Sequence, residues 1–370
     1  MLCHRTPPFH GVSIMGDLMY DYFIKNKFVV KSINITTSKN IKKSNNIFKF
    51  YFLIKKIFIY FKTIYIFKPN IIYITPSITN FLFYRDFIIL EITRIFIYIF
   101  NLKIKIYIHI HMRPYEISMF RKNILYKLYF RNTNVIFLSH LLIKDFPSFI
   151  FKKCHIHILP NTIQAISNKE NAISSLNKFD FFKSKDNTII ITYFGHLIES
   201  KGYRRALLIA KELSKKNISI NFHFYGDFGS NRDKNYFHQF ITINKLHNIV
   251  FYKGICSRID IWKVFNLTHI LIFPTYTEAF PLTILEALSV GIPVISTSVG
   301  AIPELINNDQ GILIRETKDE NLFINNFVQS IEIIILKWDK YLSIKSINTY
   351  YEKWDSIQFQ INISNIFKNH

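Results

Sequence analysis

The chain has 370 residues, and its 49% hydrophobic content excludes an intrinsically disordered protein and leaves room for two domains with separate cores. It carries 47 Lys and Arg against 25 Asp and Glu, a formal net charge of +22. Cys3, Cys154 and Cys256 are scattered without CxxC spacing, which argues against a zinc site or a disulfide framework and favours a cytoplasmic protein.

The first residues predict a loop that runs directly into a helix. His10 and Gly11 precede a helical pattern that begins at Val12. The first amides of a helix have no partners within it, so His10 and Gly11 are candidates for a phosphate or acceptor loop. The alternative is an ordinary turn before a core helix. Residues 1–16 lack the apolar centre of a signal peptide.

A helix predicted over Ile47–Lys62 has a cationic side, because Lys42, Lys49 and Lys56 recur at every seventh position. This side could face the phosphates of an anionic membrane, or it could be the solvated stripe of a core helix. Charged residues interrupt every long apolar run, so no spanning helix is expected. The net charge also suits a nucleic acid, but a composition rich in Ile, Lys and Asn explains it equally well.

The following segments alternate between strand and helix. The strand predicted over Lys103–His111 ends in His109 and His111, whose side chains share one face at its carboxyl end, where open α/β sheets bind ligands. A metal pair is the alternative, although no nearby carboxylate or cysteine completes a ligand set. The other predicted strands are Phe28–Thr36, Pro69–Thr75, Val135–Ser139 and His155–Leu159, and the other helices are Asn80–Phe100, Tyr115–Phe130 and Leu141–Phe151.

Residues 161–187 are polar and weakly patterned, and the alternation restarts after them. A continuous apolar strand over Thr188–Phe194, of the kind covered on both faces, leads into a loop that contains Lys201. The further predicted strands are Ile218–Tyr225, Ile249–Tyr252, His269–Phe273 and Pro293–Ser296, with helices over Asp233–His247, over Arg258–Asn266 and from Pro281. The pattern predicts two parallel sheets, each with helices on both faces, and a ligand in the cleft between them.

The stretch Pro274–Leu305 has the strongest functional pattern. Glu278 lies in a loop after an apolar strand, and Glu286 lies eight positions later in the helix. Pro281 near the start of this helix and Gly291 after its end are typical limits. The amides at the helix start suit an anion such as a diphosphate.

These residues resemble the retaining glycosyltransferases of family 4, which have the GT-B fold of two facing Rossmann-like domains. The resemblance covers Thr188–Ile314 best. It rests on FGHLIESKGY from Phe194, YGD from Tyr225, FYKG from Phe251 and EAFPLTILE from Glu278, and more loosely on PPFHG, KPNIIYI, HIHMR and LPN in the first half. The implied domains are 1–162 on the acceptor side and 188–349 for the nucleotide-sugar, with a linker over 163–187. A closing helix over 350–370 would cross back to the first domain.

The resemblance also implies roles for individual residues. Lys201 would neutralise the leaving diphosphate, Glu278 would contact the donor sugar, and Glu286 would accept hydrogen bonds from the ribose hydroxyls. His111 would reach the donor sugar, with His109 as the second choice. The donor site would also include Gly195, His196 and the amides of Phe280, Leu282 and Thr283. No metal or cofactor is implied.

Two departures from the family pattern stand out. His196 occupies a position where many members have an arginine, which places more weight on Lys201, with Arg204 or Arg205 as further support. Only six residues precede Pro7, too few for the usual first strand.

The resulting hypothesis is a cytoplasmic, retaining, metal-independent glycosyltransferase. It would move a sugar from a nucleotide-sugar donor to a glycan or lipid-linked acceptor in surface polysaccharide or lipopolysaccharide assembly, with peripheral contact at the inner face of the cell membrane left open. A non-catalytic basic protein of the same fold that binds sugars or nucleic acid is the main alternative, although nucleic acid is not the favoured partner. A phosphorylase on a related scaffold is a third possibility.

Overall fold

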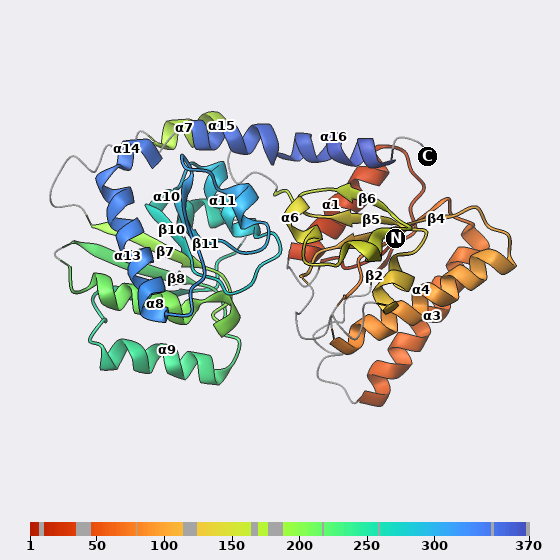
Figure 1. Cartoon of the computed structure of the whole chain (residues 1–370), viewed down its shortest axis with the longest axis horizontal. Coiled ribbons are helices and arrows are strands. Elements are labelled where there is room, and N and C mark those ends of the chain that lie inside the picture. Colours follow the sequence, from red (N-terminus) through yellow and green to blue (C-terminus); the bar gives the residue numbers. More distant parts are fainter. Residues whose placement is uncertain are drawn as a thin grey trace. The chain divides into compact units, whose positions relative to one another are not determined.

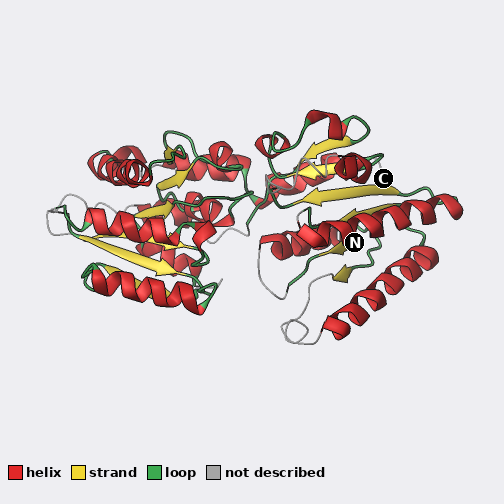
Figure 2. Cartoon of the chain, turned by 60° about the horizontal axis from the view of Figure 1, so that its bottom comes forward, coloured by secondary structure: helices red, strands yellow, loops and turns green. Residues whose placement is uncertain are grey.

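The computed structural model describes residues 1–6, 11–34, 46–78, 80–113, 124–163, 169–176, 188–216, 218–257, 260–341 and 344–367. The chain forms two compact units, Met1–Asn161 with Gln360–His370, and Thr162–Phe359. Each unit contains a six-stranded, entirely parallel sheet flanked by helices (Figures 1 and 2). The predicted α/β fold class with two doubly wound sheets is therefore confirmed.

The sheet of unit 1 has the strand order β2-β1-β3-β4-β5-β6. Its strands are β1 (Leu2–Cys3), β2 (Ile33–Asn34), β3 (Ile71–Ile74), β4 (Lys105–Ile110), β5 (Asn134–Phe137) and β6 (His155–Ile158). Its helices include α1 (Gly11–Lys25), α3 (Asn46–Phe67), α4 (Asn80–Ile99) and α6 (His140–Ile143), and residues 124–130 are also helical.

Two predictions for unit 1 are wrong in detail. The residues before Pro7 do form a first strand: β1 pairs with both β2 and β3, and the Leu2 carbonyl accepts a hydrogen bond from the Thr75 amide at 3.1 Å. The single helix expected over Leu141–Phe151 is instead α6 followed by a 3-10 turn, Ser148–Phe151. The break has a local cause, because Pro147 disfavours helical backbone at the residue before it.

Unit 2 has the strand order β12-β11-β10-β7-β8-β9. Its strands are β7 (Ile189–Phe194), β8 (Ile220–Tyr225), β9 (Val250–Gly254), β10 (Ile270–Phe273), β11 (Val294–Thr297) and β12 (Gly311–Ile314). Its helices are α7 (Lys169–Leu176), α8 (Tyr203–Leu213), α9 (Asn231–Ile243), α10 (Ile261–Leu267), α11 (Leu282–Ser289), α12 (Ile302–Leu305), α13 (Glu320–Leu336), α14 (Trp338–Tyr341), α15 (Ile344–Lys353) and the start of α16 (Ser356–Phe367).

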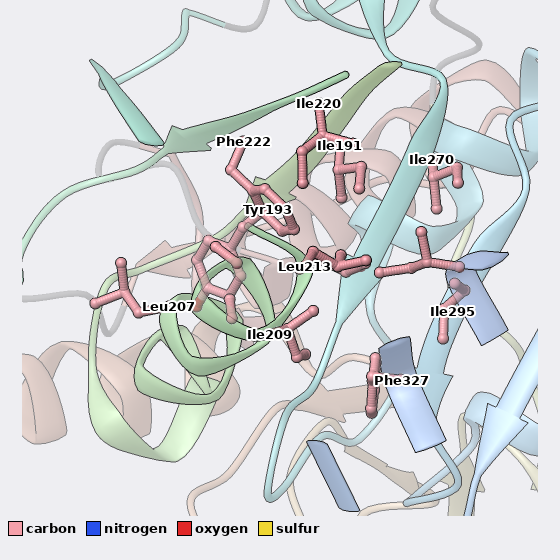
Figure 3. Packing of buried hydrophobic residues seen from close by; sticks show 14 of the residues in the cluster. Ile191, Tyr193, Leu207, Ile209, Leu213, Ile220, Phe222, Ile270, Ile295 and Phe327 are labelled. Atoms are coloured by element: carbon pink, nitrogen blue, oxygen red, sulfur yellow. The ribbon is translucent and has the colours of Figure 1, made fainter. Parts of the chain in front are cut away.

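The core of unit 2 lies between its sheet and the helices α8, α9 and α13. Tyr193 and Phe222 of the sheet belong to one buried cluster with Leu207 of α8 and Phe327 of α13 (Figure 3). Apolar residues on both faces of the strands explain why they appear in the sequence as continuous apolar runs rather than as alternating ones.

The segment predicted as a closing helix contains the end of α15 and all of α16, which are separated at Trp354 and Asp355. The last residues of the chain, from Gln360, belong to unit 1, where Phe367 packs against Phe23 and Tyr107 with ring centroids 5.0 and 4.5 Å apart. In the described part of the chain, none of the helices combines the length and the apolar character needed to span a bilayer.

We expect one buried histidine to make unit 2 sensitive to acid. His269 accepts a hydrogen bond from the Ile190 amide at Nδ1 (2.9 Å), and burial lowers its pKa to about 4. In the unfolded chain this histidine binds a proton below about pH 6.5, whereas in the folded protein it does so only near pH 4. The free energy of unfolding therefore falls as the pH drops from about 6.5 toward 4. His269→Gln keeps an acceptor without titrating. Between pH 7 and 5, its free energy of unfolding in urea should fall by about 2 kcal/mol less than that of the wild type. Equal pH dependence in the two proteins would contradict this assignment.

Candidate active site

The candidate site lies at the point where the strand order of unit 2 reverses. β7 and β10 are neighbours in the sheet, with Leu271 opposite Thr192. Connections from two such strands leave toward opposite faces, which opens a crevice at their carboxyl ends where doubly wound sheets bind ligands. The loop with Lys201 follows β7, and the loop with Glu278 follows β10. The fold thus places both predicted residues at the carboxyl edge of the sheet, where these two strands meet.

Backbone contacts hold the two loops together. The Ser200 carbonyl accepts hydrogen bonds from the Tyr276 amide (3.1 Å) and the Thr275 hydroxyl (3.2 Å). Gly202 has a φ of 77°, and a Cβ built there would lie 1.9 Å from the Pro274 carbonyl oxygen. Only glycine permits so close an approach in that backbone conformation.

Lys201 and Glu278 form an ion pair, with Nζ 2.5 Å from Oε2. Their side chains are 28% and 16% exposed, so both still contact solvent. Glu278 Oε1 also accepts a weak hydrogen bond from the Ala279 amide at 3.3 Å. The sequence placed the two residues in one site but did not predict that they bind each other.

Tyr193 supports the Lys201 loop from below. Its ring is buried in the core, and its hydroxyl contacts the carbonyl oxygens of His196 at 2.9 Å and Lys201 at 3.1 Å. Burial, followed by the charge of Glu278 and by Tyr203, raises the pKa of Tyr193 far above its ordinary value, so the hydroxyl stays protonated and can donate. The sequence did not predict this role, although the Tyr193 hydroxyl is a polar group within a mostly apolar strand.

The helix α11 presents its amino-terminal end beside Glu278. Its N-cap is Pro281, which makes no side-chain cap hydrogen bond, so the first amides of the helix gain no capping side chain from it. Phe280 packs on Trp354, with ring centroids 5.8 Å apart. Leu282 and Thr283 are partly exposed at the first turn, which leaves this end of the helix accessible to a ligand.

Glu286 lies within α11 and is 4% exposed, although the neighbouring Leu285 and Ala287 are apolar and buried. A carboxylate so deeply buried is unusual unless it serves a purpose. Cys256, in the loop after β9, lies near enough that the charge of Glu286 contributes to raising its thiol pKa, after burial and Asp260.

Gly195 and His196 begin the Lys201 loop. The Gly195 amide donates to the Tyr225 carbonyl at 3.0 Å, and a Cβ on Gly226 would lie 1.9 Å from the Gly195 carbonyl oxygen. His196 is exposed. These contacts fix the start of the loop against β8.

The two arginines considered as support for Lys201 are engaged elsewhere. Arg205 is 3% exposed, lies 2.7 and 3.0 Å from Glu316 and Glu320, and stacks on the ring of Tyr276 at 3.5 Å. Arg204 lies 3.2 Å from Glu199. Arg205 therefore stabilises the Glu278 loop through Tyr276 rather than adding positive charge beside Lys201.

In unit 1, the structure distinguishes the two histidines at the end of β4. His109 is completely buried, and its Nδ1 lies 2.6 Å from the Tyr73 hydroxyl. Burial, and then the neighbouring His111, hold the pKa of His109 well below its ordinary value, so it is a neutral core residue. His111 follows the strand and is partly exposed, so it remains the residue predicted to reach the donor sugar. Gly11 opens α1, whereas His10 lies outside the described residues.

A cavity of about 470 Å³ in unit 1 lies at the opposite, amino-terminal edge of the sheet, lined mainly by apolar side chains such as Phe28 and Ile64. We do not assign it to the candidate site, because parallel sheets bind ligands at the carboxyl edge. Among the described residues, no group of three or more His, Cys, Asp or Glu side chains is placed to hold a metal ion.

Comparisons with known proteins show what the chain is similar to. Residues 175–332 match the family described as "Glycosyl transferases group 1". The chain is 25% identical over 140 residues to the capsular polysaccharide biosynthesis glycosyltransferase CapM of Staphylococcus aureus, which is 37% of this chain and 35% of CapM. It is 27% identical over 199 residues to the UDP-Gal:alpha-D-GlcNAc-diphosphoundecaprenol alpha-1,3-galactosyltransferase of Escherichia coli, which is 52% of this chain and 48% of that protein.

Solved structures match over the whole chain. Sucrose-phosphate synthase (tll1590) from Thermosynechococcus elongatus superposes with a TM-score of 0.72 and 14% identity, over 100% of this chain and 95% of that one. Anabaena Alr3699/HepE in complex with UDP and glucose superposes with a TM-score of 0.67 and 16% identity. The match covers 100% of this chain and 98% of that one. These structures confirm the GT-B fold, and the match of residues 175–332 supports the resemblance to glycosyltransferases, while membership of family 4 stays a prediction.

Proposed function

We propose that the chain, whose residues 175–332 match the group 1 glycosyl transferases, is a retaining glycosyltransferase that uses a nucleotide-sugar donor. The observation that carries the proposal is the Lys201–Glu278 ion pair at the strand-order reversal of unit 2. A cation and a carboxylate held together beside the start of a helix suit a substrate that joins a diphosphate to a sugar.

Lys201 stabilises the leaving group in this proposal. As the bond between the anomeric carbon and the diphosphate oxygen breaks, negative charge grows on that oxygen. An ammonium in a partly dry site stabilises this charge strongly, and the amides of Phe280, Leu282 and Thr283 at the start of α11 support the phosphates. Because the loop is fixed through Ser200 and Tyr193, this charge is already in position before the reaction.

Glu278 has two partners in succession. Without donor its carboxylate neutralises Lys201. A bound diphosphate offers Lys201 more negative charge, so Glu278 is released to accept hydrogen bonds from the donor sugar hydroxyls. Glu286 accepts in the same way from the ribose diol, and Gly195 and His196 border the donor. From unit 1, His111 is the proposed contact with the sugar and the Gly11 loop the proposed contact with phosphate or acceptor.

The reaction proposed is a same-face displacement. The acceptor oxygen forms its bond to the anomeric carbon on the face that the diphosphate leaves. The proton of the acceptor hydroxyl passes to the departing phosphate oxygen, so the products are the glycoside and a nucleoside diphosphate. Neither a protein nucleophile nor a metal ion is required.

The acceptor we propose is a glycan or a lipid-linked sugar in surface polysaccharide or lipopolysaccharide assembly, at the cytoplasmic face of an anionic membrane. The names of the relatives support this choice, because CapM belongs to capsule biosynthesis and the Escherichia coli relative is named for a diphosphoundecaprenol acceptor.

A thermal-shift panel tests the proposal. We expect a cognate nucleotide-sugar, and its nucleoside diphosphate, to raise the melting temperature, because a ligand at 100 times its Kd adds about 2.7 kcal/mol to stability. The nucleoside alone is the matched control and should have little effect. Stabilisation by single-stranded nucleic acid but by no nucleotide-sugar would favour the non-catalytic alternative, and stabilisation by inorganic phosphate with turnover would favour a phosphorylase.

A further inference from the structure

Helices α3 and α4 of unit 1 lie against each other along one side of the unit (Figure 1). The Tyr60 and Thr93 hydroxyls are 3.1 Å apart in the buried contact between them. Aromatic rings extend this contact, with Phe61 and Phe96 centroids 5.6 Å apart. Leu90 on α4 and Ile64 on α3 are buried. The two helices thus already have a completed inner face.

The outer face of α4 is apolar as well. Tyr84, Ile88, Ile92, Ile95 and Ile99 are each between 41% and 66% exposed. They recur at intervals of four, four, three and four residues, so they form one continuous stripe along the helix. A helix that belonged only to a soluble core would be polar on this side.

Helix α3 and the end of α4 enlarge this surface. Among the residues of α3 whose side chains are described, the exposed apolar ones are Ile54, Phe58, Ile59, Tyr65 and Ile66, and Tyr98 and Phe100 are exposed at the end of α4. In unit 2, by contrast, the exposed residues Ile243, Ile255 and Leu336 lie on three separate segments. Scattered residues of that kind are ordinary, whereas a contiguous patch indicates an interaction surface. We call the exposed residues of α3 and α4 the α3–α4 face.

The charges around the α3–α4 face are positive. The acidic residues of α4, Asp86 and Glu91, are both in ion pairs with arginines. Lys55 and Lys62 are exposed on α3. A surface that combines apolar side chains with uncompensated cations is complementary to lipids with anionic headgroups. It also repels a second copy of itself.

One lysine of the stripe considered from the sequence, Lys56, does not belong to this surface. Lys56 is partly buried, and its ammonium donates to the Asn34 carbonyl at 2.7 Å. Burial, and then Arg85, lower its pKa. Lys42 lies outside the described residues, as does the side chain of Lys49. We therefore define the interaction surface by its exposed isoleucines and aromatics and leave Lys56 out of it.

We propose that the α3–α4 face binds unit 1 to an anionic lipid bilayer, with the isoleucine stripe of α4 at the acyl boundary and Lys55 and Lys62 beside the lipid phosphates. Tyr65, Tyr84 and Tyr98 suit the interface, because an aromatic ring with a hydroxyl favours the headgroup level. This inference names the surface that makes the membrane contact of the proposed function. It rests only on that membrane contact. The donor site belongs to unit 2 and does not depend on it.

Co-sedimentation of the full chain with vesicles tests the inference. We expect binding to vesicles of phosphatidylglycerol with phosphatidylcholine, weaker binding to phosphatidylcholine alone, and a decrease as salt rises. The triple variant I88S/I92S/I95S should bind anionic vesicles at least about tenfold more weakly, because it removes apolar area from the acyl boundary of the bilayer. The matched control I243S/I255S/L336S removes three even more exposed apolar residues from unit 2 and should bind as the wild type does.

Three outcomes would overturn the inference. The first is that the wild type does not bind anionic vesicles at low salt, and the second is that wild type and I88S/I92S/I95S bind equally. The third is that the wild type is a dimer in ultracentrifugation, and that this variant alone converts it to monomers while vesicle binding is unchanged. Nucleotide-dependent thermal shifts of the same variant separate the two proposals. If the wild type binds the donor but not vesicles, only the membrane role of the α3–α4 face is rejected. If it binds vesicles but no donor, only the proposed enzymatic function is rejected.

Discussion

Replacing Lys201 by alanine should lower the rate of sugar transfer about 100- to 1000-fold, the effect expected when one charge that stabilises a leaving group is removed. The release of nucleoside diphosphate with a cognate donor and acceptor measures it. The loss should appear mainly in kcat, because the charge on the leaving oxygen develops in the transition state. The fold should survive, since Lys201 and Glu278 both retain contact with solvent.

Lys263→Ala is the matched control for this variant. Lys263 also forms an ion pair, with Asp260 at 2.8 Å, but its side chain is 75% exposed and lies on α10. Turnover of this control should equal that of the wild type. If Lys201→Ala were as active as Lys263→Ala, Lys201 would be a solvated loop lysine and the assignment of the site would be wrong.

Gly202→Ala should be nearly as damaging, although it adds a single methyl group. Its Cβ would lie 1.9 Å from the Pro274 carbonyl oxygen, so the Lys201 loop must move away from the Glu278 loop. The hydrogen bonds from Thr275 and Tyr276 to Ser200 would then be lost. A displacement of about 1 Å at a reacting group costs about 100-fold in rate. We also expect stability to fall by about 2 to 4 kcal/mol, through backbone strain and the broken contacts.

Gly254→Ala separates the clash from the backbone strain. Gly254 has a φ of 80°, close to that of Gly202, but a Cβ built there meets nothing within 4 Å. This control should lose only about 1 kcal/mol, the cost of a left-handed backbone for alanine, and should keep its activity. Urea unfolding and steady-state kinetics of both variants test the pair. Equal losses would mean that the contact with Pro274 has no role in the site.

The sequence predicted the fold well where burial leaves a strong pattern. Thr188–Phe194 appears as a strand because parallel strands covered on both faces are apolar throughout, and β7 lies within those limits. Positions after such strands also indicated the ligand edge, and the resemblance to family 4 glycosyltransferases placed Lys201 and Glu278 in one site. Their ion pair could not be predicted, because it depends on how two loops 77 positions apart approach each other.

Short elements and surfaces were harder to predict. A strand of two residues such as β1 has no period, and it exists because β2 and β3 supply its partners. The exposure of the outer stripe of α4 could not be predicted, since apolar spacing is the same whether a protein or a lipid covers it. Tyr193 and Arg205 support the site through contacts with carbonyl oxygens and carboxylates that no motif contains.

The most direct test of the central claim is a calorimetric titration of the cognate nucleoside diphosphate and monophosphate into wild type and Lys201→Ala. The wild type should bind the diphosphate at least about tenfold more tightly than the monophosphate, because a charge-assisted contact contributes about 1.5 to 3 kcal/mol. Lys201→Ala should lose most of that preference while it still binds the monophosphate. An undiminished preference for the diphosphate in Lys201→Ala would contradict the account.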